Sequence, residues 1–419
     1  MKIMKLKLHW QIFIAMALGA GFALLAGEKA LIAAPLGEIF MRLLKMIIVP
    51  LILTSITTGV AQLGDSRTLG RLGAKTFGYY FLSSIMAILV GLTLTNLIRP
   101  GVGAELAGTE VSPDVTQLQT TGSLGDLIIR MIPTNPFAAA AEGEVLGVIF
   151  FSIILGFAIT KLSGKPHEFL LNLFDFSFQA IMRLTRGIIR LAPIGVFGLI
   201  SKAVATAGFG LFKAVGMYMI TIASGLTIHL FLILPLLIFL FTRYNPILHF
   251  RAMSSAMATA FSTSSSGATL PVTMNCVENN VGVSNRIMKL TLPLGATMNM
   301  DGTALYECAG VLFIAQALGF PLTLLDQMTI VLVAFLASVG AAAVPSAGLV
   351  MIFIVLNAVG LGDDPRALML VGTMLAVDRP LDMYRTVVNI TSDSVGATVV
   401  AHSEGEELTY PMKLEENPT

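Results

Sequence analysis

Long stretches without a charged residue constrain this sequence more than any other feature. No Asp, Glu, Lys or Arg occurs in four of them, residues 10–27, 76–98, 214–242 and 327–362. A helix needs about 20 apolar residues to cross the roughly 30 Å core of a bilayer, so several of these stretches can span a membrane. Charged residues make up only 12% of the chain, against about 25% in typical soluble proteins. The sequence therefore indicates a polytopic membrane protein and excludes a soluble enzyme, a disordered protein and a nucleic-acid binder.

The charged residues between the apolar stretches predict the orientation of the chain. Lysines and arginines cluster before residue 10 and after the second, fourth and sixth of the six spans given below. Residues 99–144, in contrast, hold six acidic residues and two arginines. Because basic loops stay on the cytoplasmic side, we expect the N-terminus in the cytoplasm. The alternation predicts six spans, at about 10–30, 37–62, 75–98, 145–162, 168–206 and 212–242.

Two later apolar stretches are better interpreted as re-entrant helical hairpins than as spans. Residues 252–277 are uncharged but contain five consecutive hydroxyl residues at 262–266, and residues 327–362 have a Pro-Ser-Ala-Gly sequence at their middle. Each half of the second stretch is too short to cross a bilayer, and its centre favours a sharp turn. A span with buried charge follows each hairpin, at 286–317 and 364–402. This arrangement points to an inverted repeat with a binding site near the membrane centre.

Six polar residues in segment 364–402 share one face of a predicted helix. At 100° per residue they fall within an arc of about 100°. They are Asp378, Asp382, Arg385, Thr386, Asn389 and Asp393. Because ionisable residues inside a membrane are costly, we expect this face to meet a partner, a cavity or a ligand. The structural alternative is an internal salt bridge between Asp382 and Arg385 that locks two helices.

The chemistry of this face suits a zwitterion that carries an additional acid group. An arginine binds a carboxylate through two parallel hydrogen bonds, so Arg385 is the candidate carboxylate ligand. Asp382, close by on the same face, can bind an ammonium group. Asn389 and Thr386 offer neutral hydrogen bonds to a second carboxylate. Asp393 has no basic partner in the pattern, and a bound metal ion would satisfy it.

Segment 286–317 contains Asn299-Met-Asp-Gly-Thr303 and, four residues later, Glu307. In a regular helix Asn299, Thr303 and Glu307 would share a face, while Asp301 would point elsewhere. Gly302 permits local unwinding, which would free backbone carbonyls nearby, and unwound carbonyls beside a carboxylate coordinate Na⁺ in discontinuous membrane helices. The carbonyls concerned are those of Gly295, Thr297, Asn299 and Met300.

Four of these motifs, in order and in register, resemble the dicarboxylate/amino acid:cation symporter family, which includes the glutamate transporters. They are Ser264-Ser-Ser-Gly-Ala-Thr-Leu-Pro271, Asn299-Met-Asp-Gly-Thr-Ala-Leu-Tyr-Glu307, Val344-Pro-Ser-Ala-Gly348 and Asp382-Met-Tyr-Arg-Thr-Val-Val-Asn389. Tyr79-Tyr-Phe-Leu-Ser-Ser84 also matches the third span of the family. The resemblance covers about residues 10–400.

The resemblance implies an all-α membrane protein with eight spans, two re-entrant hairpins and inverted repeats, assembled as a homotrimer in a cell inner membrane. Both termini would be cytoplasmic. Residues 1–74 (spans 1 and 2) and 99–206 (an external loop with spans 4 and 5) would form a scaffold. Residues 75–98 (span 3) and 207–403 would form a moving transport domain, and 404–419 a solvated cytoplasmic tail.

The resemblance also assigns the ligands. Arg385 would bind the side-chain carboxylate of the substrate, Asp382 its amino group, and the first-hairpin backbone its α-carboxylate. The remaining substrate-binding residues would be Thr386, Asn389, Ser264, Ser266, Thr303 and Gly348. Three sets of Na⁺ ligands would be Asp393, Asn389, Asn299 and Gly295; Thr297, Met300, Ser338, Val339 and Ala341; and Ser83, Ser84, Asn299 and Asp301. Na⁺ would be a co-transported ligand, and no other cofactor is implied.

Single positions distinguish the subfamilies. Asp393 favours Na⁺, because proton-coupled bacterial relatives carry Asn there, and Glu307 matches animal members, in which this acid is associated with proton symport. Archaeal members place an arginine at the position of Ser264, and animal members place one at the position of Met383. We therefore expect this site to lack the second arginine that each of those groups keeps.

The predicted function is Na⁺-coupled symport of L-glutamate or L-aspartate by an elevator mechanism, with H⁺ as the candidate second coupling ion, and not enzymatic catalysis. A C4-dicarboxylate carrier of the same fold is the alternative, and Asp382 separates the two because a dicarboxylate has no ammonium. An ion channel is the alternative from a different functional class. An intramembrane aspartyl protease using Asp301 and Asp382 would leave the Arg, Asn and Ser groups unexplained. His229, in the middle of a span, is interpreted as a packing or hydrogen-bonding residue.

Overall fold

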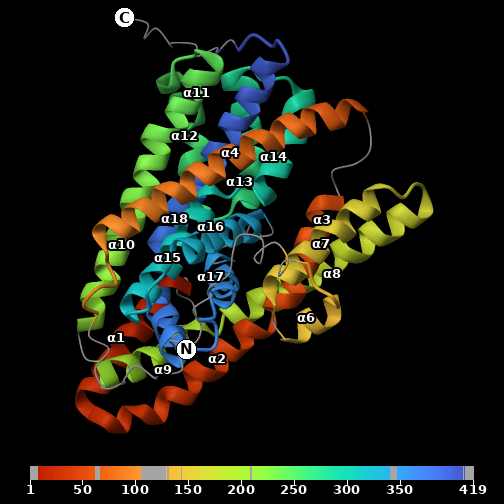
Figure 1. Ribbon diagram of the computed structural model, residues 1–419. Coiled ribbons are helices and arrows are strands. Elements are labelled where there is room, and N and C mark those ends of the chain that lie inside the picture. The colour runs from red at the N-terminus through yellow and green to blue at the C-terminus, as the bar shows by residue number, and fades with distance from the viewer. Residues whose placement is uncertain are drawn as a thin grey trace, which may run out of the picture.

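Helices form all the regular secondary structure in the described part of the chain of this computed structural model (Figure 1). The structure describes residues 8–61, 67–104, 129, 132–142, 144–207, 210–339, 347–408 and 410. The prediction of an all-α protein is confirmed. By length and composition, three helical stretches can cross a bilayer, Trp10–Ala61, Arg71–Ile98 and Lys213–Thr242. The count of eight spans and two hairpins stays a prediction.

Residues 8–61 form one nearly continuous helical stretch. It consists of α1 (Leu8–Ala26), the 3₁₀ helix η2 (Gly27–Ala33), α2 (Ala34–Met46) and α3 (Ile48–Ala61). The interruption at Ile47 has a local cause, because Pro50 has no N–H to donate to the carbonyl of Met46. At 52 residues, Trp10–Ala61 is long enough for two crossings.

The predicted single span at 168–206 is wrong in one respect, because the segment is bent. Helix α8 (Lys165–Ile189) and helix α9 (Ala192–Ala207) meet at an angle of 51°. Pro193 lacks the N–H that would bond to the carbonyl of Ile189, so α8 ends there. Helix α9 then packs along α1 and α2, and the shorter helices α6 (Pro136–Glu142) and α7 (Val145–Thr160) complete this part of the molecule.

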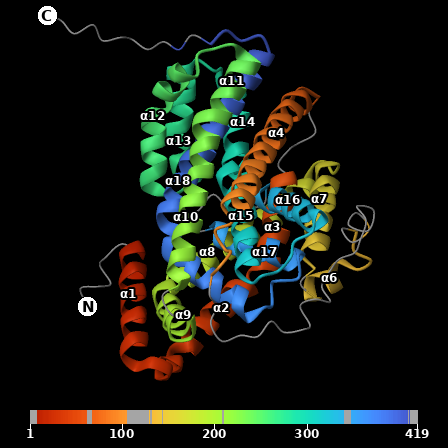
Figure 2. The ribbon, with the colours of Figure 1, turned by 60° about the vertical axis from the view of Figure 1, so that its left-hand side comes forward.

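A second group of helices surrounds α18 (Pro365–Ser403), which is continuous over 39 residues (Figure 2). The first members of the group are α4 (Arg67–Ile98), α10 (Gly210–Ile228), the π-helix η4 (His229–Ile233) and α11 (Leu234–Thr242). Next come α12 (Pro246–Thr263), α13 (Ser266–Cys276), the π-helix η5 (Val277–Val281), α14 (Asn285–Met298) and α15 (Asp301–Ala317). Helices α16 (Leu324–Val339) and α17 (Ala347–Ala358) follow. Helix α15 packs against α16, α17, α4 and α18.

The first predicted hairpin corresponds to α12 and α13, which pack against each other and join at Ser264 and Ser265, and its re-entry into the membrane stays a prediction. Ser264 adopts a left-handed conformation (φ 51°), and the side chain of Ser265 caps α13 by accepting a hydrogen bond from the N–H of Ala268 at 3.2 Å. Helices α16 and α17 pack against each other as the arms of the second predicted hairpin. Its Val344-Pro-Ser turn lies outside the described residues.

The predicted solvated tail begins later than expected. Glu404 accepts hydrogen bonds from Lys75 and Arg71, and the N–H of Ser284 donates to Glu406 at 3.0 Å. Leu408 and Tyr410 are buried against the helices. Residues 404–408 and 410 are therefore docked, and the division into scaffold and transport domain stays a prediction.

Candidate functional site

The break between α14 and α15 brings Asn299 and Asp301 to one place. Asn299 and Met300 leave the helical conformation, so α14 ends at Met298 and α15 begins at Asp301. The unwinding was predicted, but it lies before Gly302 rather than at it. The expectation that Asp301 points away from Asn299 is wrong, because it assumed a regular helix. Both side chains are fully buried.

Four side chains from three helices donate hydrogen bonds to the Asp301 carboxylate. Its Oδ1 accepts from Ser83 at 3.2 Å and Ser84 at 2.7 Å, both on α4. Its Oδ2 lies 2.6 Å from the hydroxyl of Ser392 and 2.9 Å from Nε2 of His229. The predicted ligand set of Ser83, Ser84, Asn299 and Asp301 is thus assembled, since Ser83 also lies 3.3 Å from Asn299 Oδ1.

Asp393 forms the neighbouring part of the same polar cluster. Its Oδ1 accepts a hydrogen bond from Asn299 Nδ2 at 2.9 Å. Gly295 lies against it so closely that a Cβ at that position would be 2.6 Å from Asp393 Oδ1 and 2.7 Å from the hydroxyl of Tyr80. Within the described residues, neither Asp301 nor Asp393 forms an ion pair with a lysine or arginine. Two buried carboxylates without a lysine or arginine partner suit a cation.

The remaining predicted Na⁺ ligands are assembled less completely. Thr297 is exposed, and its hydroxyl donates to the carbonyl of Leu294 at 3.0 Å. Met300 and Ser338 are buried, Val339 is partly buried, and Ser338 donates to the carbonyl of Phe335. Helices α14 and α16, which carry most of this set, contact each other. Ala341 lies outside the described residues.

Arg385 is the best candidate for a ligand of an anion. It is 1% exposed, and its guanidinium lies 3.8 Å above the ring of Tyr306. Only Nη2 is engaged by carboxylates, at 3.1 Å from Asp378 and 2.8 Å from Asp382. Nη1 and Nε have no hydrogen-bond partner in the described structure. Buried donors without a partner are costly, and a bound carboxylate would satisfy Nη1.

The two hairpins supply the other walls of this site. A Cβ at Gly348, on α17, would lie 2.4 Å from Nη1 of Arg385, so the backbone of the second hairpin closes directly on the free donor. At the tip of the first hairpin Ser264 is buried, and its hydroxyl has no partner in the described structure. Ser266, the first residue of α13, is also buried, and the positive end of the helix dipole favours an anion here.

Asn389 and Thr386 are more occupied than the sequence suggested. Asn389 donates to the hydroxyl of Thr303 at 3.2 Å and accepts from the N–H of Gly302 at 2.8 Å, so it joins α18 to α15. Thr386 donates to the carbonyl of Asp382 within α18 at 2.8 Å. Asn389 therefore connects the two candidate sites, since Gly302 follows Asp301 directly.

The salt bridge that the structural alternative predicts is present, but it lies within one helix and does not connect two helices. Asp382 and Arg385 are both on α18, and Asp382 is also 3.4 Å from Nη1 of Arg379. Positions 264 and 383 hold Ser and Met, so the arginines of the other groups are absent there, but Arg379 is a second arginine near the site that was not foreseen. Its position on α18, three residues before Asp382, was the signal in the sequence.

Glu307 occupies an isolated position on α15. Its side chain is fully buried, and neither carboxylate oxygen has a hydrogen-bond partner in the described structure. It can therefore gain or lose a proton without breaking a hydrogen bond.

Sequence reasoning missed several participants. Ser392 lies just outside the predicted polar face of α18, and Tyr306 was treated only as part of a motif. His229 was interpreted as a hydrogen-bonding residue, which is confirmed, but its partner Asp301 was not foreseen. These contacts join residues that are far apart in the sequence, so helical periodicity carries no signal for them.

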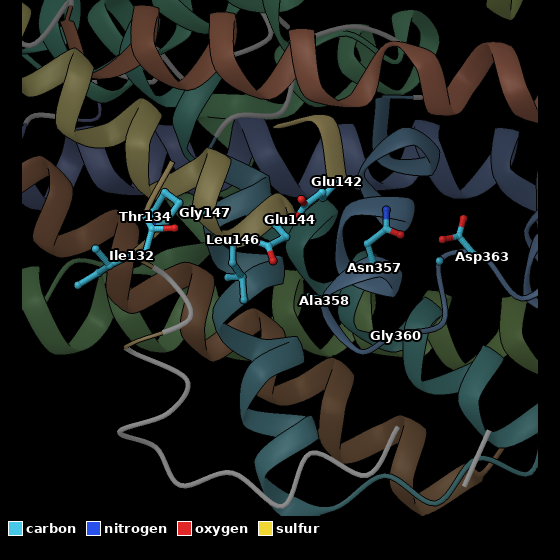
Figure 3. Close-up of a pocket in the computed structure, with 12 residues that line it drawn as sticks. Ile132, Thr134, Glu142, Glu144, Leu146, Gly147, Asn357, Ala358, Gly360 and Asp363 are labelled. Atoms are coloured by element: carbon cyan, nitrogen blue, oxygen red, sulfur yellow. The ribbon is translucent and has the colours of Figure 1, made fainter. Parts of the chain in front are cut away.

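A surface cavity of about 530 Å³ lies apart from this site. Glu142 and Glu144, beside α6 and α7, form one wall, and Asn357 and Asp363, from the end of α17 and the α17–α18 connection, form the other (Figure 3). None of the predicted substrate or Na⁺ ligands lines it.

Comparison with known proteins gives consistent matches over nearly the whole chain. The profile of the sodium:dicarboxylate symporter family matches residues 8–403. The chain is 36% identical over 430 residues to excitatory amino acid transporter 3 of Mus musculus, an alignment that covers 91% of this chain and 81% of the relative. It is 37% identical over 434 residues to the Homo sapiens protein of the same name, with coverages of 91% and 81%. An excitatory amino acid transporter of Caenorhabditis elegans is 36% identical over 434 residues, with coverages of 90% and 82%.

Proposed function

This chain belongs to the sodium:dicarboxylate symporter family, and on that premise we propose that it is a secondary active transporter that carries an acidic amino acid into the cell together with Na⁺. L-Glutamate and L-aspartate are the proposed substrates. The observation that carries this proposal is the buried guanidinium of Arg385, which has two unpartnered donors and faces the second hairpin.

The arrangement around Arg385 favours an amino acid with an acidic side chain. A side-chain carboxylate would accept hydrogen bonds from Nη1 and from the Nη2 hydrogen that Asp382 releases, while the other Nη2 hydrogen keeps its carboxylate partner Asp378. Asp382, released from Arg385, would bind the ammonium group of the substrate. The α-carboxylate would lie at the start of α13, where Ser264 has a free hydroxyl. A C4-dicarboxylate would leave Asp382 without an ammonium partner, so the amino acid is favoured.

Na⁺ would bind at the carboxylates of Asp301 and Asp393 as a co-transported ligand. Asn389 supports coupling between ion and substrate, because it contacts both Gly302 and Thr303. Occupation of the Na⁺ site would fix the start of α15 and with it the substrate-binding face of α18. Glu307 is the candidate carrier of an additional proton.

The remaining features of the proposal concern the whole assembly. We propose a homotrimer in a cell inner membrane, with both termini cytoplasmic, in which α4 and the helices from α10 to α18 move as one elevator past the others. Contacts of α16 and α17 with α3 and α7 support an orientation in which the second hairpin is covered by the scaffold. Lys45 on α2 also bonds to Gly362 and Asp363 across this boundary.

Uptake of radiolabelled L-aspartate into proteoliposomes tests the function directly. We expect accumulation that requires an inward Na⁺ gradient and is inhibited by unlabelled L-glutamate. Stronger inhibition by succinate than by either amino acid would favour the dicarboxylate carrier. Current without concentrative uptake would favour a channel.

A further inference from the structure

His229 is fully buried and contacts a candidate Na⁺ ligand without belonging to any predicted ligand set. Its Nε2 lies 2.9 Å from Oδ2 of Asp301, and its Nδ1 has no hydrogen-bond partner in the described structure. Because a carboxylate oxygen can only accept, Nε2 donates its hydrogen to Asp301.

The backbone places His229 at an irregularity in its helix. The π-helix η4 begins at His229, and the N–H of Leu234 bonds to the carbonyl of His229, five residues earlier. Pro235 follows and cannot donate to the carbonyl of Phe231, which favours the shifted pattern. Single π turns are costly relative to a regular helix and occur frequently at functional sites.

The two oxygens of Asp301 have different surroundings. His229 and Ser392 donate to Oδ2, which leaves Oδ1 directed toward Ser83 and Ser84 on α4. The oxygens of Ser83 and Asn299 are also within 3.3 Å of each other. Oδ1 is therefore the oxygen that can join the hydroxyl and amide oxygens around a cation.

We propose that His229 is a positioning residue for Na⁺, which fixes the Asp301 carboxylate by holding Oδ2 so that Oδ1 faces the ion. The proposal rests on the proposed Na⁺-coupled function. Removing a hydrogen-bond partner of a metal ligand typically lowers metal affinity by 10–100-fold. Na⁺ affinity should depend on the hydrogen that Nε2 donates and not on the imidazole ring itself. Glutamine should therefore substitute for histidine, because its amide nitrogen lies at a similar distance from the backbone.

Na⁺ titration of the thermal stability of purified protein, without amino acid, tests this inference. In His229→Leu the Na⁺ concentration for half-maximal stabilisation should rise about tenfold, and in His229→Gln it should return to within about threefold of wild type. His249→Leu is the matched control, since His249 is equally buried but bonds to Ser394 and Tyr410. The control should lower the melting temperature and leave the Na⁺ midpoint unchanged.

The outcomes separate this inference from the function on which it rests. An unchanged Na⁺ midpoint in His229→Leu, or a His229→Gln variant as impaired as His229→Leu, overturns the positioning role alone. If His229→Leu does not fold, His229→Met provides the same test with a more flexible apolar side chain. A wild-type protein that shows neither Na⁺-dependent stabilisation nor Na⁺-driven uptake overturns the proposed function as well.

Discussion

At the scale of single residues, the site is organised around buried groups whose bonding capacity is incompletely used. Arg385 has two free donors, Ser264 a free hydroxyl and Glu307 two free oxygens in the described structure. Native proteins leave few buried polar groups unsatisfied, and such groups call for an explanation. A bound acidic amino acid explains the first two, and a transferable proton explains the third.

Replacement of Arg385 by cysteine should change the substrate class. Loss of the guanidinium removes two charge-assisted hydrogen bonds, so aspartate affinity should fall by about 2–3 kcal/mol. Serine or alanine binding should appear, because the space of the guanidinium opens and no bare cation remains. Competition binding in saturating Na⁺ measures both effects. Arg379→Gln is the control and should lose little, since its contact with Asp382 is long at 3.4 Å and partly exposed. Retained aspartate affinity in Arg385→Cys would leave Arg385 as a structural ion-pair partner only.

Replacement of Asp393 by asparagine should weaken Na⁺ and substrate binding together. The carboxylate is buried and, among the residues that the structure describes, bonds to a neutral amide, Asn299, so its charge is available to a cation. Because binding linkage is reciprocal, Na⁺ raises substrate affinity by the factor by which substrate raises Na⁺ affinity, so weaker Na⁺ binding lowers substrate affinity at limiting Na⁺. Isothermal titration with aspartate at several Na⁺ concentrations measures this, with Asp363→Asn as an exposed control. An unchanged Na⁺ dependence in Asp393→Asn would remove Asp393 from the ion ligands.

Replacement of Glu307 by glutamine should abolish sensitivity to a proton gradient and preserve Na⁺ coupling. Glutamine keeps the size of the side chain but cannot release a proton in this range. Aspartate uptake into proteoliposomes with an imposed pH gradient, at fixed Na⁺ gradient, measures the difference. Should uptake by the wild-type protein show no response to the pH gradient, Glu307 has a structural role instead.

At the scale of helices, function depends on interruptions. Ser264 turns the first hairpin through a left-handed residue, Asn299 and Met300 separate α14 from α15, and η4 begins at His229. Each interruption brings side chains or backbone ends to α18, which is itself continuous. A regular helix satisfies its own backbone groups, so only its ends and breaks can offer them to a ligand.

A methyl group at Gly348 should obstruct the substrate site from the second hairpin. The added Cβ would lie 2.4 Å from Nη1 of Arg385, a distance that forces one of them to move. Overpacking of this kind typically costs 1–3 kcal/mol, so Gly348→Ala should lower aspartate affinity by about 1–3 kcal/mol. Gly216→Ala is the control, because no atom lies within 4 Å of a Cβ there. Equal aspartate affinities of the two variants would place Gly348 away from the bound substrate.

At the scale of the whole molecule, an ion pair links the proposed scaffold to the proposed moving part. Lys45 on α2 donates to the carbonyl of Gly362 at 2.7 Å and to Asp363 at 2.9 Å. Asp363 also lines the cavity in Figure 3, whose opposite wall carries Glu142 and Glu144. Both the contact and the cavity therefore depend on how the two parts lie relative to each other.

Removal of the Lys45 amine should shift the balance between positions of the transport domain. Asp363 is almost fully exposed, and an exposed ion pair contributes about 0–1 kcal/mol, so Lys45→Met should change the population by at most about fivefold. Pulsed electron paramagnetic resonance between spin labels at positions 169 on α8 and 247 on α12 measures the distribution. Arg42→Met is the control, since its partner Glu38 lies on the same helix. Identical distributions in Lys45→Met and wild type would exclude a role for this contact.

The sequence by itself determined the properties that follow from local patterns. Uncharged stretches identified a membrane protein, and the hydroxyl-rich break identified the first hairpin. The spacing along 364–402 placed Arg385, Asp382 and Asp393 on one face. A helix repeats every 3.6 residues, so its own sequence reveals which side chains share a face and where a turn interrupts it.

Only the tertiary structure decided which elements meet. Ser83 and Asp301 are 218 positions apart, and His229 and Asp301 are 72 apart, so no periodicity connects them. The break at Asn299 and Met300 turned Asp301 toward α4, which a regular helix would not have done. The docking of residues 404–408 and 410 was likewise decided by packing. Periodicity reports on one helix at a time, whereas a site built from several helices depends on their arrangement in space.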